Sequence, residues 1–226
     1  MNQSVINVFK SVFSTAKYLL FLGMMLVLTS LPDMFLFAPR ENLLIVLLYI
    51  FLSGLIIIFL INRYKKSVDT KLFNIVNQTH FSKQNVLFTT AMYGVMWGID
   101  VIFNNLIQLG TPENQEILED MFVGSPIILG ISVVIVAPIV EELIFRGIFT
   151  NYFFNSNKKY SKWIILLTSS LLFGLAHEVE PSMSLLYYSS VGAVLGITYL
   201  YTKDIKYNII LHFINNSIAL YYMYMG

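Results

Sequence analysis

The chain has 226 residues, of which 57% are hydrophobic and only 12% are charged, and its mean hydropathy is +0.70. An average soluble domain carries about 25% charged residues, so this composition excludes a soluble globule, and its hydrophobicity excludes a disordered chain. The net charge of +1 offers no basic field for a nucleic-acid partner, and the absence of cysteine excludes disulfides and thiolate chemistry. The sequence therefore predicts an all-α, multi-pass protein of a cell membrane.

Seven stretches are apolar over about the 20 residues that a helix needs to cross the hydrocarbon core. In chain order they cover residues 18–37, 43–61, 86–109, 122–154, 163–177, 182–201 and 207–225. The first contains Pro32 and Asp33 and is expected to stop near Leu31. The fourth is too long for one crossing and is expected to protrude, tilt or break. Pro138 is compatible with a membrane helix, because neighbouring helices can pair the backbone groups that it frees.

Basic residues predict the orientation of these helices, since the cytoplasmic loops of membrane proteins are rich in Lys and Arg. Most of the basic residues lie before the first stretch, in the loop at 62–85, around Lys158 and around Lys203. The intervening loops carry one basic residue or none, and the loop at 110–121 is acidic instead. This alternation predicts seven spans with the N-terminus in the cytoplasm.

An ionisable side chain in the hydrocarbon core costs about 2.5–3.5 kcal/mol on insertion scales, so such residues are candidates for function. Those in the predicted spans are Asp100, Glu141, Glu142, Arg146, His177 and His212. Glu142 and Arg146 are four residues apart on one helical face and are expected to form an ion pair. Glu141 points about 100° away, so it lacks a nearby cation and can hold or take a proton. The alternative for this motif is a structural cluster of salt bridges. Asp100 is expected to bond neighbouring backbone or Asn104 and is left out of the site.

Two histidines complete the polar set in the spans. Phe173 and His177 share a helical face with small residues between them. His212 and Asn216 share another face, while Asn215 is expected to point elsewhere. A histidine and a carboxamide on one face can orient a water molecule, donate to an oxyanion or bind a metal. Taken alone, each pattern is also typical of an interfacial histidine or of hydrogen bonding between helices.

Counting residues gives the expected depth of each candidate, at a rise of about 1.5 Å per residue. Glu141 and His177 are similarly far from the turn that joins their helices, so they are expected to lie level. His212 is close to the start of its helix and is expected about 10 Å nearer the cytoplasm at the same rise. The mismatch shrinks if the hairpin around 158–162 projects from the membrane.

Three patterns occur in order along the chain: E-E-x-x-x-R at 141–146, F-x-x-x-H at 173–177 and H-x-x-x-N at 212–216. Together they resemble the CAAX protease and bacteriocin-processing family (CPBP, or Abi) of intramembrane proteases, over roughly residues 122–225. The resemblance implies a catalytic four-span bundle at 111–226. The three spans and the cytoplasmic loop at 1–110 carry no motif of their own. The resemblance also implies a membrane protein that acts on a membrane-embedded or lipid-associated peptide. The compact chain, in which no eukaryotic targeting signal is seen, favours a bacterial setting.

The resemblance assigns a role to each motif residue. The residues that act on the reacting water are Glu141, assisted by His177, His212 and Asn216, and those that support them are Glu142, Arg146 and Phe173. Family members are described both as glutamate-type proteases and as metalloproteases. Glu141, His177 and His212 could hold zinc with an open fourth position. Because the H-E-x-x-H spacing is absent, no cofactor is favoured, and zinc stays an alternative.

Two functions of different class follow from these motifs. The first is an intramembrane endopeptidase that serves peptide maturation or bacteriocin self-immunity. The second is a non-catalytic scaffold or immunity protein that binds a partner or a toxin and uses the polar cluster for packing. An ion-coupled transporter is disfavoured, because many transporters have repeated halves and this sequence shows no repeat.

Overall fold

The computed structural model describes residues 20–38, 41–69, 81–107, 110–153 and 161–225. These residues are predominantly helical and include no β-strand, as the composition predicts. Five helical stretches among them are long and apolar enough to cross a membrane: Leu20–Phe37, Leu43–Ser67, Lys83–Asn105, Pro126–Tyr152 and Met183–Thr202. The protein is therefore a multi-pass membrane protein. Some predicted features lie outside the described residues. They are the span ends at residues 18, 109 and 154 and the basic residues Lys10, Lys17, Lys71, Lys158 and Lys159.

Two of the seven predicted spans are absent from this group of five. α8 (Ser161–His177) is apolar but has only 17 residues. α10 (Ile205–Met225) has 21 residues, but its polar side chains, among them Asn208 and His212, lower its apolar character. The count of seven and the cytoplasmic N-terminus therefore stay predictions.

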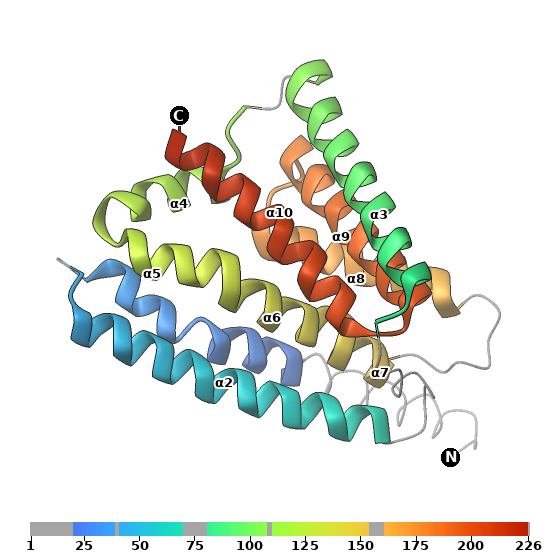
Figure 1. Ribbon diagram of the computed structural model, residues 1–226, viewed down its shortest axis with the longest axis horizontal. Helices are drawn as coiled ribbons and strands as arrows, with labels where there is room; N and C mark the ends of the chain where they lie inside the picture. Colours follow the sequence, from blue (N-terminus) through green and yellow to red (C-terminus); the bar gives the residue numbers. More distant parts are fainter. Residues whose placement is uncertain (1–19, 39–40, 70–80, 108–109, 154–160, 226) are drawn as a thin grey trace, which may run out of the picture.

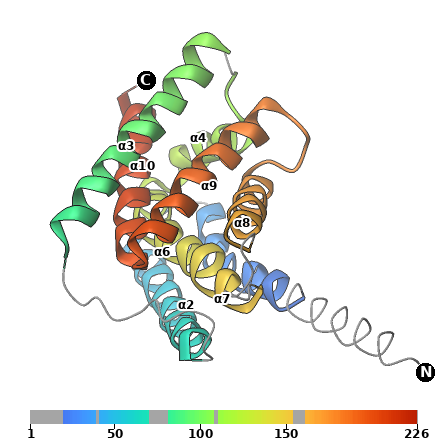
Figure 2. The ribbon, with the colours of Figure 1, turned by 90° about the vertical axis from the view of Figure 1, so that its right-hand side faces the viewer.

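One long helix runs through the middle of the bundle (Figure 1). Its consecutive segments are α5 (Pro126–Ile131), η3 (Ser132–Val136), α6 (Ala137–Glu141), η4 (Glu142–Ile148) and α7 (Phe149–Phe153), of which η3 and η4 are π-helical. The helix at 20–29, η1 (Pro32–Phe37) and α2 (Leu43–Asp69) lie on one side of it. On the other side lie α3 (Lys83–Val101) with its π-helical end η2 (Ile102–Leu106), α8, α9 (Met183–Thr202) and α10 (Figures 1 and 2). α4 (Glu113–Gly124) crosses the end where α10 finishes.

The fourth predicted span is divided at Ser125, which corrects its expected start at residue 122. The backbone of Ser125 (φ −142°, ψ 59°) leaves helical geometry, and Pro126 then opens α5. Proline fits a first helical turn because the N–H that it lacks would have no helical partner there. The carboxylate of Glu41 accepts hydrogen bonds from the N–H groups of Ile127 (3.2 Å) and Ile128 (2.6 Å), which complements the positive end of the helix.

Pro138 accounts for the first π-helical segment of the central helix. The N–H of Ala137 donates to the carbonyl of Ser132, five residues back, and Pro138 has no N–H to continue this pattern. The carbonyl of Val133 is therefore available to another donor. The side-chain amide of Asn216 in α10 donates to it at 2.9 Å. The proline thus leaves a carbonyl group that forms a hydrogen bond between the central helix and α10.

α8 and α9 approach closely because α9 presents glycines to α8. A Cβ atom on Gly192 would lie 3.1 Å from the carbonyl oxygen of Ser170 and 3.2 Å from Cβ of Phe173. A Cβ atom on Gly196 would lie 2.6 Å from Cδ1 of Leu166. Two small residues four apart allow membrane helices to pack backbone against backbone. This contact sets the position of Phe173, one turn before His177.

We expect Gly192→Ala to lower the free energy of unfolding by about 1–3 kcal/mol, because the added methyl group must displace the α8 backbone or Phe173. Gly54→Ala in α2 is the matched control, since a Cβ atom there meets nothing within 4 Å. Alanine favours a helix over glycine, so the control should be neutral or slightly stabilising. Thermal unfolding of both variants in detergent measures the difference. Equal melting temperatures would contradict the close approach.

The two ends of the bundle differ in charge. The ends of α2, α7 and α9 meet the starts of α3 and α10, as shown by hydrogen bonds from Ser82 to Tyr207 (2.7 Å) and from Asn151 to Ser67 (3.2 Å). The described basic residues at this end are Arg63, Lys65, Lys66, Lys83, Lys162, Lys203 and Lys206. The opposite end carries the acidic helix α4. The loops with most basic residues therefore share one end, and the assignment of that end to the cytoplasm stays a prediction.

Candidate active site

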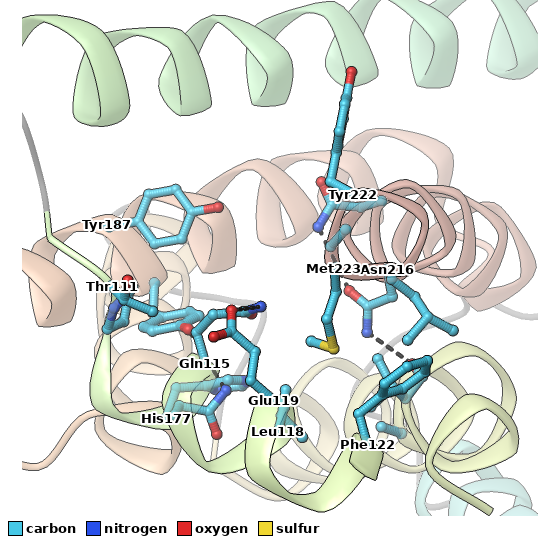
Figure 3. A pocket seen from close by; sticks show the side chains of 18 of the residues that line it. Thr111, Gln115, Leu118, Glu119, Phe122, His177, Tyr187, Asn216, Tyr222 and Met223 are labelled. Carbon is cyan, nitrogen blue, oxygen red and sulfur yellow. Dashed lines mark hydrogen bonds between the residues drawn. The ribbon is translucent and has the colours of Figure 1, made fainter. Parts of the chain in front are cut away.

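A cavity of about 870 Å³ lies between the central helix, α4, α8, α9 and α10 (Figure 3). Glu141 and His177 line it, together with Asn216 in the middle of α10. α4 contributes Gln115 and Glu119, which are joined by a 3.1 Å hydrogen bond. The cavity therefore connects the middle of the bundle with its acidic end.

Glu141, His177 and His212 come together where the central helix meets α8 and α10. Nε2 of His177 lies 3.9 Å and Nε2 of His212 lies 3.8 Å from Oε2 of Glu141. Among the described atoms, this carboxylate oxygen has no hydrogen-bond partner. The separations are too long for direct hydrogen bonds and suit a water molecule placed between the groups. Three of the predicted site residues thus face one common point.

The second nitrogen of each imidazole fixes which nitrogen carries the proton. Nδ1 of His177 lies 2.9 Å from the carbonyl oxygen of Phe173, and Nδ1 of His212 lies 3.1 Å from Oε1 of Glu142. A carbonyl or an ionised carboxylate can only accept, so each Nδ1 donates. The neutral imidazole then presents a lone pair at Nε2. Glu141 therefore faces two ring nitrogens, each of which accepts when its imidazole is neutral and donates when it is protonated.

Glu142 is a fully buried carboxylate whose oxygens both have partners. Oε1 accepts from Nη1 of Arg146 at 3.1 Å as well as from His212, and Oε2 accepts from Nδ2 of Asn208 at 3.1 Å. Nη2 of Arg146 donates to the carbonyl of Gly192 in α9 at 2.9 Å. A buried ion pair needs additional bonds of this kind to offset its desolvation. The predicted Glu142–Arg146 pair is present, and Glu142 holds the ring of His212 through the bond to Nδ1.

Aromatic rings hold the two histidines in place. The ring of Phe173 lies 4.5 Å from the ring of His177 and 5.7 Å from that of His212, between centroids. The guanidinium of Arg146 lies 4.5 Å from the same phenyl ring. Tyr188 stacks on His177 at a centroid distance of 4.7 Å. His177 is therefore in contact with two aromatic rings that restrict its rotation.

Asn216 lines the cavity but lies apart from the three converging residues. No hydrogen bond of the described residues joins it to Glu141, His177 or His212, because its amide is bonded to the carbonyl of Val133. Asn215 lines the cavity too, which corrects the expectation that it points elsewhere. Residues three apart on a helix share a face nearly as well as residues four apart.

The expected depth of His212 is wrong, since its Nε2 atom lies 3.8 Å from Glu141 rather than a turn or more away. The central helix continues past Glu141 to Phe153, whereas α10 begins at Ile205, only seven residues before His212. The central helix therefore extends further beyond the site at the basic end. Counting residues from the loops assumes that all helices end at the same depth. The end of the central helix and the start of α10 lie at different depths.

The sequence patterns missed two residues that position the histidines. Asn208 is completely buried and bonds both Glu142 and the carbonyl of Leu195, the latter at 2.6 Å. It lies four residues before His212, so the spacing that relates His212 to Asn216 would have found it. Tyr188 had no such signal, because its partner His177 is on a different helix.

The three converging residues fit zinc in the type of donor that they offer. Zinc binds imidazole nitrogen and carboxylate oxygen, and metal-bound histidines donate their other N–H as these do. A tetrahedral zinc ion would place its ligand atoms about 3.4 Å apart. The separations here are 3.8 and 3.9 Å. Within the described ranges, no group of three His, Asp or Glu side chains is already arranged around a metal position.

Comparison with known proteins agrees with this geometry. Residues 123–218 match the family model described as "Type II CAAX prenyl endopeptidase Rce1-like". The chain is also 30% identical over 95 residues to the membrane-embedded CAAX protease MroQ of Staphylococcus aureus (strain USA300). Both comparisons support a resemblance of residues 123–218 to the CPBP family. They agree with the resemblance that the three motifs predict.

The CPBP region contains Glu141, His177, His212 and Asn216, whereas the first three predicted spans lie outside it. The alignment with MroQ covers 41% of this chain and 38% of MroQ, so the chain spans well under half the length of that relative. No solved structure matches the chain significantly. The CPBP assignment thus concerns the part of the chain that carries the cavity.

Proposed function

We propose that the protein is an intramembrane endopeptidase that hydrolyses a peptide bond in a membrane-embedded or lipid-associated peptide. The observation that carries this proposal is the convergence of an unpartnered carboxylate oxygen with two imidazole nitrogens, at 3.8 and 3.9 Å. The cavity of about 870 Å³ beside them offers room for a peptide. The CPBP match supports the same activity.

The reaction begins with His212 protonated at both ring nitrogens and with a water molecule between Glu141, His177 and His212. The water donates one hydrogen to Glu141 and the other to Nε2 of His177. Glu141 takes the first proton as general base while the water oxygen attacks the carbonyl carbon of the scissile bond. These side chains supply every group that this proton transfer and attack require.

The oxyanion that forms lies against His212, which donates from Nε2 in its protonated form. Glu142 at Nδ1 stabilises this imidazolium, and Arg146 keeps Glu142 ionised. Glu141 then gives its proton to the amide nitrogen, the C–N bond breaks, and the products are a carboxylic acid and an amine. Asn216 uses one amide hydrogen on Val133 and offers the other to the substrate backbone.

Zinc chemistry is the alternative for the same residues. Glu141, His177 and His212 would hold the ion, which supplies a Lewis acid and activates a bound water molecule. We propose the metal-free scheme because the sequence lacks the H-E-x-x-H spacing of zinc peptidases and because the separations suit a water molecule.

We propose peptide maturation or bacteriocin self-immunity as the biological role in a bacterial membrane, with a secreted peptide precursor as the substrate. MroQ is named as a CAAX protease, so a peptide with a lipidated C-terminus is the second substrate class. Because the candidate site lies among membrane-spanning helices, a substrate of either class is expected to carry an apolar segment near the bond that is cut.

Reconstitution of the purified protein in liposomes tests the activity and the metal together. Candidate peptides of both classes are added, and the products are identified by mass spectrometry. The metal-free scheme predicts cleavage at an unchanged rate after treatment with a zinc chelator. Loss of cleavage with the chelator, followed by recovery when zinc is added, would replace this scheme with the zinc alternative.

A further inference from the structure

A second cavity, of about 620 Å³, adjoins the catalytic cavity on the side of α3. The two cavities have five lining residues in common: Asn104, Tyr187, Asn215, Ala219 and Tyr222. Figure 3 shows Tyr187 and Tyr222 on the side of the catalytic cavity that faces the α3 ribbon. The two cavities therefore adjoin along these residues, and together they extend from Glu141 to the region between α3 and α10.

The outer part of the second cavity is aromatic and exposed on the surface of the bundle. Trp97 is 61% exposed, Tyr221 is 58% exposed and Tyr222 is 69% exposed. Trp97 lies on α3, which is one of the candidate membrane spans, and both tyrosines lie near the end of α10. Aromatic side chains at such positions contact both apolar chains and polar groups at a membrane interface. This cavity thus opens sideways, away from α4.

Carboxamide side chains line both of the adjoining cavities. Asn105 lines the second cavity, Asn104 and Asn215 line both, and Asn216 lines the first. A carboxamide offers a donor and an acceptor, as a peptide group does. An extended peptide within a membrane must pair its N–H and C=O groups with protein, since lipid offers no partner. This row of side chains is suited to that task.

The wall that carries Asn104 is fixed to α9. The hydroxyl of Tyr187 donates to Oδ1 of Asp100 at 2.7 Å, rather than Asp100 bonding the backbone or Asn104 as the sequence predicts. The ring of Tyr187 also meets Phe103 at a centroid distance of 5.5 Å. After Val101 the helix becomes π-helical at η2, which contains Asn104 and Asn105. Such segments are frequent where a helix serves a functional site.

We propose that the second cavity binds the part of the substrate that continues into the membrane, held in an extended conformation by the carboxamides of Asn104 and Asn215. This inference rests on the proposed function and specifies its substrate. The substrate is a peptide with an apolar membrane anchor next to the scissile bond, and the anchor reaches the site between α3 and α10. A short peptide without an anchor bypasses this cavity and reaches Glu141 past α4.

Because the chain contains no cysteine, single introduced cysteines can be modified without background. Asn105→Cys and Val101→Cys, both in the second cavity, are labelled with a membrane-permeant benzyl thiosulfonate. Val95→Cys, exposed on the same helix and outside both cavities, is the control. Each variant is compared with itself before labelling, on one cleavage sequence with and without a transmembrane anchor. We expect the label to slow cleavage of the anchored substrate about tenfold or more at either cavity position. Cleavage of the free peptide, and of both substrates by labelled Val95→Cys, should be unchanged.

Equal slowing of both substrates would assign the second cavity to the catalytic site itself and overturn the proposal. Absence of any slowing at both cavity positions would overturn it as well. If the unlabelled protein cleaves neither substrate, the proteolytic function fails and this inference fails with it. If it cleaves both and the label has no effect, only the binding role of the second cavity fails.

Discussion

Glu141→Gln should abolish peptide cleavage without unfolding the protein. Glutamine keeps the size of the side chain but cannot take a proton, so removal of the general base should lower the rate by about 10²–10⁴-fold. The fold should tolerate the change, because Oε2 of Glu141 has no hydrogen-bond partner among the described atoms. The rate is measured on reconstituted protein by mass spectrometry, and thermal unfolding in detergent is measured in parallel.

Glu116→Gln is the matched control for this experiment. Glu116 lies on the exposed side of α4, outside the cavity, so its variant should cleave at the rate of the unmodified protein. Cleavage by Glu141→Gln at the same rate would exclude Glu141 as the base. If the protein protects cells from a toxin and the Glu141→Gln variant still does, the scaffold alternative is favoured.

Arg146→Met should cost about 3–5 kcal/mol of stability, because it leaves Glu142 buried without its cation. Both side chains are at most 1% exposed, and their atoms lie 3.1 Å apart. Lys206→Met is the matched control, since Lys206 is 46% exposed and pairs with Asp204 at a similar 3.1 Å. An exposed pair contributes about 0–1 kcal/mol, so this variant should unfold almost as the unmodified protein does. Thermal unfolding in detergent compares the two losses, and equal losses would contradict the buried ion pair.

A double variant separates the structural and catalytic roles of the same pair. Replacing Glu142 with Leu and Arg146 with Met removes both charges, so part of the lost stability should return. Cleavage should stay low, because His212 loses the carboxylate at Nδ1 that stabilises its protonated form. Recovery of both stability and cleavage would assign the pair to packing alone.

Much of the helical framework could be predicted from apolar length and spacing. The stretches predicted at 163–177, 182–201 and 207–225 correspond to α8, α9 and α10 within two residues at each end. These boundaries follow from local composition, since polar residues and turns end each apolar run. The break at Ser125 and the π-helical segments were not predicted in detail, because they depend on hydrogen-bond partners from other parts of the chain, such as the acceptor Glu41 and the donor Asn216.

The composition of the site was more predictable than its geometry. Spacing along one helix identified the Glu142–Arg146 pair, because both partners lie on the same face. The meeting of Glu141 with His212 could not be derived from counting, since it depends on how far each helix extends past the membrane. Asn208 and Tyr188 show the same difference between spacing and packing. Asn208 can be found from helical spacing, whereas the role of Tyr188 depends on how two helices pack.

Glu142 connects the central helix with α8, α9 and α10. It belongs to the central helix, it bonds Asn208 and His212 of α10, and through Arg146 it reaches Gly192 of α9 and Phe173 of α8. A shift of α10 at this level would break two of its hydrogen bonds at once. We therefore expect any movement of α10 that admits a substrate to occur beyond Asn216 rather than at the level of Asn208 and His212.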